Sequence, residues 1–470
     1  MNLQALFDQA VDAHQGGRLD EAEQLYRQLL AAEPGNPQLL HPLGVLQAQQ
    51  GHVDEALTLL HGLVAQRPTD AALLKDCAVV LAGAGRNEDA LAMFDRALAL
   101  KPDDLELLQL RIDVLLRLKR HVDALVACDQ ALAPNPATAI LLHQRGLALA
   151  GLGRHADAET CFARVLELTP NSDAALYERG AALAAQHRIA DWFAAFHGFA
   201  HHRDKASAFS SAAGNTFAHR ARHDAEQSDW LRMQGIQPGA RLRIEGGERL
   251  AGPAINPANA KDAGQQWRKN RPQVVVVDDL LTDEALAALR RFCLGSNVWR
   301  TGYESGYLGA FPETGFSAPL LAQIAEEFQT VFPEICGGLV LKYAWAFKYD
   351  SAMQEGVHIH ADDAAVNVNF WITPDDANLD PQTGGLLVWD VPAPQGSDYG
   401  KFSIEQAAVR DFLANNQAKS ITVPYRANRA AIFDSELFHK TDSIRFKDGY
   451  ENRRINVTML YGERGAGKLG

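Results

Sequence analysis

Two histidines and one aspartate in the second half of the chain have the side chains and the spacing of a metal site. His360 and Asp362 form an H-x-D motif, and His439 follows seventy-nine residues after His360 (439 − 360). Two imidazoles and one carboxylate on one face of a metal suit iron(II) and leave three coordination positions open. The residue types therefore predict a reactive metal centre rather than a sealed structural ion.

His358 offers a second way to build this centre. Residues 358, 360 and 362 fall on one face of an extended segment, so His358 and His360 could bind a metal together, as in a cupin. We favour His360 with Asp362, because a carboxylate ligand suits iron(II) chemistry. His358 is then expected beside the ligands, supporting one of them or facing the substrate.

Two adjacent arginines near the end of the chain could bind a carboxylate close to that metal. A guanidinium can hold a carboxylate through two parallel hydrogen bonds. Arg454 shares one strand face with Asn456 and Thr458, whereas Arg453 points the other way unless the strand slips by one residue. Arg454 is therefore the arginine expected in the pocket.

The elements that must position these groups begin at Val274. Two helices followed by a run of strands predict an α+β domain built on a jelly-roll, or double-stranded β-helix, barrel. His439 is expected in a loop that follows a buried strand. The predicted helices are Glu284–Cys293 and Pro319–Phe332, and the predicted strands are Val274–Val277, Leu339–Tyr349, Ala365–Thr373, Gly385–Val391, Ser420–Val423, Arg429–Phe433 and Arg454–Tyr461.

Together, the H-x-D motif, the late histidine and the arginine resemble the 2-oxoglutarate- and iron(II)-dependent oxygenase superfamily, in its prolyl-hydroxylase-like form. The resemblance covers about Val274 to Gly462. It implies that His360, Asp362 and His439 ligate iron, and that Arg454 pairs the distal carboxylate of 2-oxoglutarate. It also implies a cosubstrate contact from Tyr349, eleven residues before His360. The implied activity is that of a dioxygenase that hydroxylates its substrate, with ascorbate as an accessory reductant.

Asn369 is a further candidate for the cosubstrate pocket. Asn367, Asn369 and Trp371 alternate with the apolar Val368, Phe370 and Ile372 along one predicted strand. Such alternation directs one set of side chains to the core and could direct the other set into the cavity.

The first part of the chain carries a repeat of thirty-four residues. Alanines and prolines recur in this register, and only 20 prolines occur in 470 residues, so the register is hard to obtain by chance. The recurring residues are Ala22, Ala56, Ala90, Ala124 and Ala158, and Pro34, Pro68, Pro102, Pro136 and Pro170. This pattern resembles the tetratricopeptide repeat family and predicts an all-α solenoid of five repeats over about residues 3–172. A sixth repeat is expected to degenerate at Trp192, read as the terminal cap.

Features inside the repeats predict how the helices pack and what they bind. Small residues such as Gly44 and Gly146 are expected to let paired helices approach closely, and glycines at another phase to mark the turns, with Arg120-His121 replacing the turn of the fourth repeat. The first helix of each repeat lines the groove in this family. A protein or peptide partner is therefore expected to contact the polar stripe His41, Lys75, Gln109, His143 and Tyr177.

The predicted organisation has three parts: a repeat domain at 1–196, a connector at 197–272 with one helix at Phe217–Met233, and the barrel at 273–470. The net charge of −13 and the lack of a basic block argue against nucleic acid and anionic membranes as partners. The five scattered cysteines fit buried core positions in a reducing compartment. With neither a signal peptide nor a long apolar stretch in the sequence, a cytoplasmic location is expected.

Overall fold

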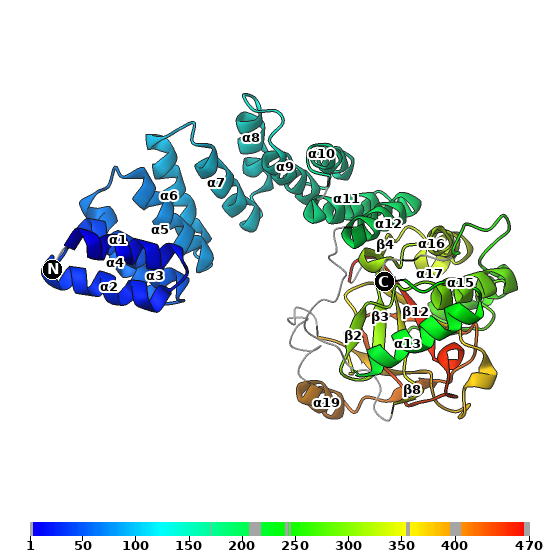
Figure 1. The fold of residues 1–470 in the computed structure, drawn as a ribbon. Coiled ribbons are helices and arrows are strands. Elements are labelled where there is room, and N and C mark those ends of the chain that lie inside the picture. Colours follow the sequence, from blue (N-terminus) through cyan, green and yellow to red (C-terminus); the bar gives the residue numbers. More distant parts are fainter. Residues whose placement is uncertain are drawn as a thin grey trace. The chain divides into compact units, whose positions relative to one another are not determined.

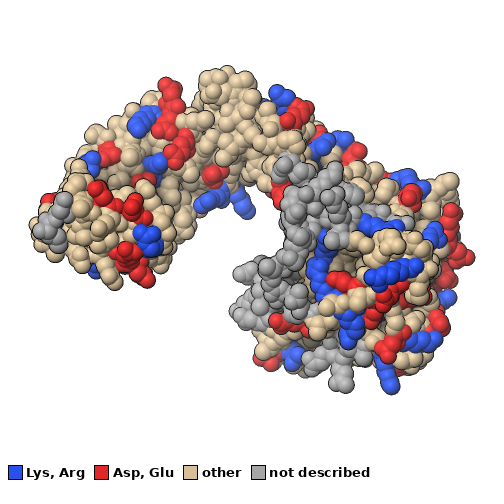
Figure 2. Space-filling view, viewed as in Figure 1, with Lys and Arg blue, Asp and Glu red and all other residues tan. Residues whose placement is uncertain are grey.

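The computed structural model describes residues 3–170, 172–205, 218–239, 243, 246–353, 358–394 and 406–464. The chain separates into two compact units, Met1–Ala175 and Leu176–Gly470 (Figure 1). The finer division into three segments stays a prediction. None of the described helices is long and apolar enough to cross a membrane. On the face seen in Figure 2, acidic and basic side chains are intermixed over each unit.

The first unit is a run of antiparallel helix pairs (Figure 1). Each pair corresponds to one thirty-four-residue repeat, and neighbouring pairs stack through the core residues of the repeat. The helices are α1 (Leu3–Gln15), α2 (Leu19–Ala32), α3 (Pro37–Gln49), α4 (Val53–Gln66), α5 (Ala71–Gly83), α6 (Asn87–Leu100), α7 (Leu105–Arg117), α8 (His121–Leu132), α9 (Ala139–Gly151) and α10 (His155–Leu168).

Small and large residues fit together inside each helix pair. The five recurring alanines are fully buried. A Cβ added at Gly146 would lie 2.6 Å from Cε1 of Phe162, so glycine is what allows α9 and α10 to approach this closely. The turns between paired helices use residues with positive φ, as at Gly51 (87°). The fourth repeat corrects the prediction in one detail: Lys119 takes the left-handed conformation there (φ 57°), not Arg120-His121.

The second unit opens with helices of its own. α11 and α12 continue the repeat pattern, yet α12 packs on α16 and η2, and Trp192 lies in the large core of this unit. Trp192, which was read as the terminal cap of the solenoid, is therefore also part of the core of the second unit. The helices are α11 (Asp173–Ala185), α12 (Ile189–Lys205), α13 (Ala218–Met233), α14 (Ala260–Lys269), α15 (Asp283–Gly295), α16 (Pro319–Val331), α17 (Pro333–Cys336), α19 (Gln406–Asn415), and the 3-10 turns η1 (Pro257–Asn259), η2 (Pro312–Thr314), η3 (Asp375–Ala377) and η4 (Tyr450–Asn452).

Antiparallel strands form the rest of the second unit. A seven-stranded sheet has the order β1-β9-β6-β12-β4-β3-β2, a three-stranded sheet has the order β10-β7-β8, and β5 pairs with β11. One buried cluster contains residues of both larger sheets, including Tyr349, Trp371, Val388 and Leu437, so the two sheets face each other across it. The strands are β1 (Val274–Val277), β2 (Thr301–Tyr303), β3 (Tyr307–Ala310), β4 (Leu341–Tyr349), β5 (Ala352–Met353), β6 (Val366–Trp371), β7 (Leu386–Pro392), β8 (Ser420–Val423), β9 (Ala430–Asp434), β10 (Leu437–Thr441), β11 (Ile444–Arg445) and β12 (Ile455–Tyr461).

The structure confirms an all-α repeat solenoid followed by a region rich in antiparallel strands, while the jelly-roll topology stays a prediction. Two local expectations need correction. His439 lies within strand β10 rather than in a loop, because this short segment pairs with β7. The connector holds a second helix, α14, which is anchored by the buried Ala263 and Trp267. Phe217, the first residue of the predicted connector helix, lies outside the described residues.

Candidate metal centre

The three predicted metal ligands meet at one point between the two sheets. His439 is the central residue of β10, and His360 pairs with it across an antiparallel bridge. Within the part of the chain that the structure describes, His360, Asp362 and His439 are the one group whose ligand atoms could share an ion, and these atoms lie within 4.8 Å of one another. The Asp362 carboxylate is 3.3 Å from Nε2 of His439 and 3.8 Å from Nε2 of His360.

Both imidazoles have their second nitrogen occupied. Nδ1 of His360 lies 2.7 Å from the carbonyl oxygen of His358, and Nδ1 of His439 lies 3.1 Å from that of Leu437. A carbonyl only accepts, so each Nδ1 must carry the proton and donate. Each Nε2 faces Asp362; without a metal it can carry a proton that interacts with this carboxylate, and a bound metal ion would replace that proton.

The carboxylate of Asp362 is held in its ionised form. Nδ2 of Asn367 donates to it over 2.7 Å, and the backbone N–H of Asp362 donates to the carbonyl of Ser435. Burial by itself raises the pKa of Asp362, but hydrogen bonding and charge from His439, His360 and Asn367 outweigh it and lower that pKa. Burial, with the neighbouring His439, lowers the pKa of His360. Both groups therefore take the protonation state that a metal requires.

A small pocket, with a cavity volume of about 30 Å³, opens beside these ligands. It is lined by Trp345, Phe347, Tyr349, His360, Asp362, Asn369, Leu386, His439, Thr441, Asn456 and Thr458. Strand β12 lies between β4 and β6, so Thr458 opposes both Trp345 and Asn369 in one cross-strand row. Residues in such a row project from the same face of the sheet. Three adjacent strands thus supply one wall of the pocket.

Polar atoms with no partner among the described residues belong to that wall. The indole N–H of Trp345 and Oδ1 of Asn369 are buried and make no hydrogen bond within the described part of the chain. Asn369 is held by its other atom, since Nδ2 donates to the hydroxyl of Thr458 over 3.0 Å. Buried polar groups are nearly always paired in folded proteins, so atoms left open in a pocket indicate where a ligand or water binds.

Arg454 is a fully buried cation behind the same pocket. It donates to the carbonyls of Gly384 and Gly385 and to Oδ1 of Asn456, and its guanidinium lies 4.7 Å from the ring centroid of Tyr349. It forms no ion pair with a carboxylate of the described residues. Burial lowers its pKa, although Tyr349 and other neighbours oppose this shift. A buried guanidinium without an anionic partner is costly, and a ligand carboxylate would compensate it.

Two of the sequence alternatives lie away from this arrangement. Arg453 points to the other side of the strand and pairs with Glu226 (2.8 Å) and Asp350 (3.1 Å). The exposed His358 is outside the group of candidate ligands and contributes its backbone carbonyl to His360.

The two other residues predicted to contact a cosubstrate, Tyr349 and Asn369, both line the pocket. Tyr349 is buried beside Arg454, with its hydroxyl 3.1 Å from that of Thr441. Asn369 reaches Arg454 only through the intervening Thr458 and Asn456.

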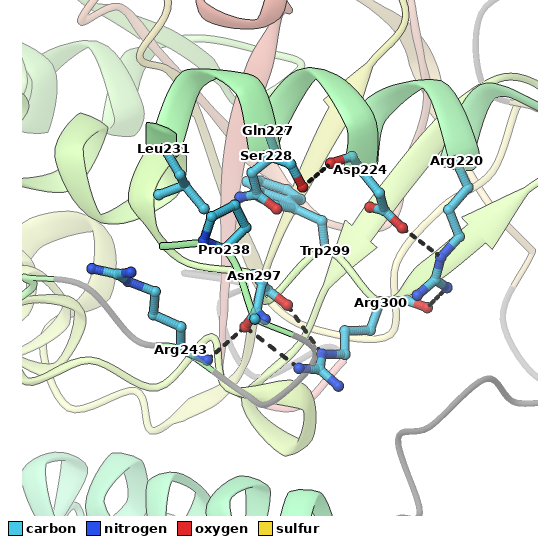
Figure 3. Close-up of a pocket in the computed structure, with 11 residues that line it drawn as sticks. Arg220, Asp224, Gln227, Ser228, Leu231, Pro238, Arg243, Asn297, Trp299 and Arg300 are labelled. Atoms are coloured by element: carbon cyan, nitrogen blue, oxygen red, sulfur yellow. Dashed lines mark hydrogen bonds and ion pairs between the residues drawn. The ribbon is translucent and has the colours of Figure 1, made fainter. Parts of the chain in front are cut away.

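A larger cavity, of about 400 Å³, lies elsewhere in the second unit, along α13 (Figure 3). Its charged side chains are already engaged with protein groups: Arg220 lies 3.7 Å from Asp224, and Arg300 donates to the carbonyl of Asn297 over 3.0 Å. Among the described residues it contains no set of metal ligands. The chemistry is therefore assigned to the smaller pocket, despite the larger size of this cavity.

The polar stripe of the repeats is partly used between neighbouring repeats. His41 pairs with Asp76 (2.8 Å), Lys75 pairs with Glu106 (3.0 Å), and the carbonyl of Gln109 accepts from Gln144. By contrast, Nε2 of His143 is buried without a hydrogen-bond partner in the described chain, and Tyr177 is half exposed. The stripe as a contact surface stays a prediction.

Several groups at the site were missed from the sequence. Asn367 was read only as part of an alternating strand, but it holds the Asp362 carboxylate. Trp345 and Phe347 of β4 line the pocket because β4 pairs with β12, the strand whose Asn456 and Thr458 were placed on the face of Arg454. Period-two alternation was the available signal for all of them. That signal gives the face of a strand but not the order of strands in a sheet.

Tetratricopeptide repeat models match residues 13–76, 76–139 and 139–172, so the N-terminal part of the chain carries these repeats. The matched residues all lie in the first unit. No curated protein matches the chain.

Similar solved structures include a tetratricopeptide repeat protein from Parabacteroides merdae, at 18% identity over 50% of this chain and 94% of that chain, with a TM-score of 0.39. MamA from Desulfovibrio magneticus is similar at 23% identity over 35% and 92%, with a TM-score of 0.32. A thermophilic repeat protein of Thermus thermophilus is similar at 26% identity over 38% and 98%, with a TM-score of 0.31.

Proposed function

We propose that the second unit is a 2-oxoglutarate- and iron(II)-dependent oxygenase that hydroxylates a protein or peptide recruited by the repeats. The observation that carries this proposal is the convergence of His360, Asp362 and His439, with ligand atoms within 4.8 Å and both Nδ1 atoms already bound to carbonyls. Two imidazoles and one carboxylate with open positions are the donor set of non-haem iron(II) oxygenases. We further propose that the two facing sheets form the double-stranded β-helix of that class.

The proposed reaction consumes oxygen and 2-oxoglutarate in equal amounts. One oxygen atom enters the substrate as a hydroxyl group, and the other enters succinate as 2-oxoglutarate loses carbon dioxide. Bound iron(II) would supply the activation of oxygen for this chemistry. The remaining tasks fall to the protein, which must bind, orient and exclude water.

The residues of the pocket divide these tasks. Arg454 is suited to the distal carboxylate of 2-oxoglutarate, since it is a buried cation without an anionic partner among the described residues. Tyr349, beneath its guanidinium, would contact the same end of the cosubstrate. Trp345 and Phe347 add apolar walls that keep bulk water from the reacting atoms.

The repeats support a protein or peptide as the substrate. Tetratricopeptide repeat proteins commonly bind protein partners, and the first unit has the repeats that such binding uses. Tyr177 is the stripe residue best able to contact a partner, because it is half exposed, whereas His41 and Lys75 already pair with neighbouring repeats.

A non-catalytic interaction scaffold is the second candidate function. It is favoured by the matched family models, since these cover repeats and no enzyme. A cupin-type enzyme that uses His358 has less support, because His358 is exposed and outside the ligand group.

Turnover of the cosubstrate separates these candidates. The full chain, purified without oxygen, would be given iron(II), ascorbate, 2-oxoglutarate and oxygen, and succinate would be measured. We expect succinate even without substrate, its loss in His360→Ala, and its retention in His358→Ala. No succinate from the wild type, or equal amounts from His360→Ala, would favour the scaffold. A wild type that forms no succinate but binds iron(II), with that binding lost in His358→Ala, would favour the cupin-type site, which does not use 2-oxoglutarate.

A further inference from the structure

Among the described residues, the segment that carries His360 has a strand neighbour on one side only, at His439 of β10. On that side His360 exchanges two backbone hydrogen bonds with His439, at 3.0 and 2.8 Å. Successive residues of an extended chain direct their N–H and C=O groups to opposite sides. Ile359 therefore directs its own backbone groups away from β10.

On the other side of this segment, the side chain of Gln406 binds the backbone of Ile359. Its Oε1 accepts from the backbone N–H of Ile359 over 2.9 Å, and its Nε2 donates to the carbonyl of Ile359 over 3.0 Å. One carboxamide thus satisfies both backbone groups of a residue that lies between His358 and His360. Gln406 is the first described residue of α19.

The peptide group between residues 358 and 359 links Gln406 to the metal ligand. Its N–H is the one held by Gln406, and its carbonyl is the one that accepts from Nδ1 of His360 over 2.7 Å. A peptide group is planar and rigid, so fixing its N–H end also fixes the direction of its carbonyl. Hydrogen bonds in such a chain also strengthen one another.

We propose that Gln406 is a positioning residue of the metal centre, which holds the 358–359 peptide group and through it sets the tautomer and rotation of the His360 imidazole. This role rests on the proposed metal site. His439 has no such support from Gln406, since its Nδ1 donates to the carbonyl of Leu437. The two histidine ligands should therefore respond differently to a change at residue 406.

The rest of α19 packs on the same segment without touching this chain of hydrogen bonds. Val409 and Leu413 are buried in a cluster with Ile359, Ala361 and Phe438, the residues that alternate with the ligands. Truncation of Leu413 therefore weakens the packing of α19 and leaves the Gln406 carboxamide in place. This makes Leu413→Ala a matched control for loss of packing alone.

The test uses the full chain loaded with cobalt(II), a paramagnetic stand-in for iron(II). Wild type, Gln406→Leu, Gln406→Asn and Leu413→Ala would be compared by calorimetric cobalt(II) titration and by proton NMR of the ligand imidazoles. For the wild type we expect two slowly exchanging, shifted Nδ1–H resonances, one from each histidine ligand. Gln406→Leu should weaken cobalt(II) binding about 10- to 100-fold, the range found for groups that orient a ligand. It should also speed solvent exchange of one resonance, that of His360.

The variants keep the inference falsifiable if the leucine variant fails to fold. Gln406→Asn retains the carboxamide on a side chain one methylene too short, and should give the same loss. Leu413→Ala should lower the melting temperature but keep both resonances and the cobalt(II) affinity. Unchanged affinity in the Gln406 variants, or an equal loss in Leu413→Ala, would overturn the role of Gln406. A wild type that binds no cobalt(II) would instead overturn the metal site itself.

Discussion

Substitution of Arg454 by lysine tests the proposed cosubstrate site, because it keeps the positive charge and removes the planar fork. Hydrogen bonds to charged groups contribute about 1.5–3 kcal/mol, so loss of the paired geometry should weaken 2-oxoglutarate binding about 10- to 150-fold. The affected bond is the one to the distal carboxylate. Pyruvate, a 2-oxo acid without that carboxylate, should bind wild type and Arg454→Lys equally. Both affinities can be measured by calorimetry on anaerobic, metal-loaded protein.

Arg453→Lys is the matched control for this prediction. It makes the same chemical change one residue earlier, where the guanidinium pairs with Glu226 and Asp350 on the other side of the strand. We expect it to leave 2-oxoglutarate affinity within about twofold of the wild type. The reasoning is refuted if Arg453→Lys weakens 2-oxoglutarate as much as Arg454→Lys does, or if pyruvate binding falls in parallel.

Three further predictions address ligand orientation, repeat packing and pH. Asn367→Leu removes the hydrogen bond to Asp362 and should weaken cobalt(II) binding about 10- to 100-fold by calorimetry, whereas Asn369→Leu should not. Gly146→Ala should lower the free energy of unfolding by about 1–3 kcal/mol, because its Cβ would clash with a buried ring. Gly83→Ala, with open space around the added Cβ, should raise the free energy of unfolding by about 0.5–1 kcal/mol. Urea unfolding would measure both changes, and changes of the same sign in the two variants would contradict the prediction. Burial lowers the pKa of His223 from 6.5 to about 3, so the unfolded chain binds a proton that the folded chain does not. The free energy of unfolding should therefore fall as pH drops from about 6.5 toward 3, by about 1.4 kcal/mol per pH unit. His223→Gln should remove this slope. An unchanged slope in that variant would contradict the assignment of the pH dependence to His223.

The first unit could be predicted from the sequence because its contacts are local. Each repeat meets only its neighbours, so a register such as that of the five alanines encodes both helix and packing. The exception is informative. Trp192 stands at the alanine position of the repeat register but packs into the core of the second unit, a contact that the repeat pattern does not encode.

In the second unit, most elements and the residues that meet at the candidate metal centre could be predicted from the sequence, but the pairing of the strands could not. The H-x-D motif and the place of His439 after a buried strand sufficed to select His360, Asp362 and His439, because few sets of side chains suit a reactive iron ion. Strand order was not accessible, since period-two alternation gives the face of each strand but not its neighbour. Asn367 and Gln406 were missed for another reason: period-two alternation indicates neither the local contact of Asn367 with Asp362 nor the contact that Gln406 makes with Ile359 from helix α19.

The central claim is that iron(II) and 2-oxoglutarate bind together at His360, Asp362 and His439. Its most direct test is the visible charge-transfer absorption that a chelated 2-oxo acid gives with iron(II), recorded without oxygen on the full chain. We predict that the band appears only when both are added, is lost in His360→Ala and in His439→Ala, and persists in His358→Ala. Absence of the band in the wild type, or its persistence in His360→Ala, would contradict the account.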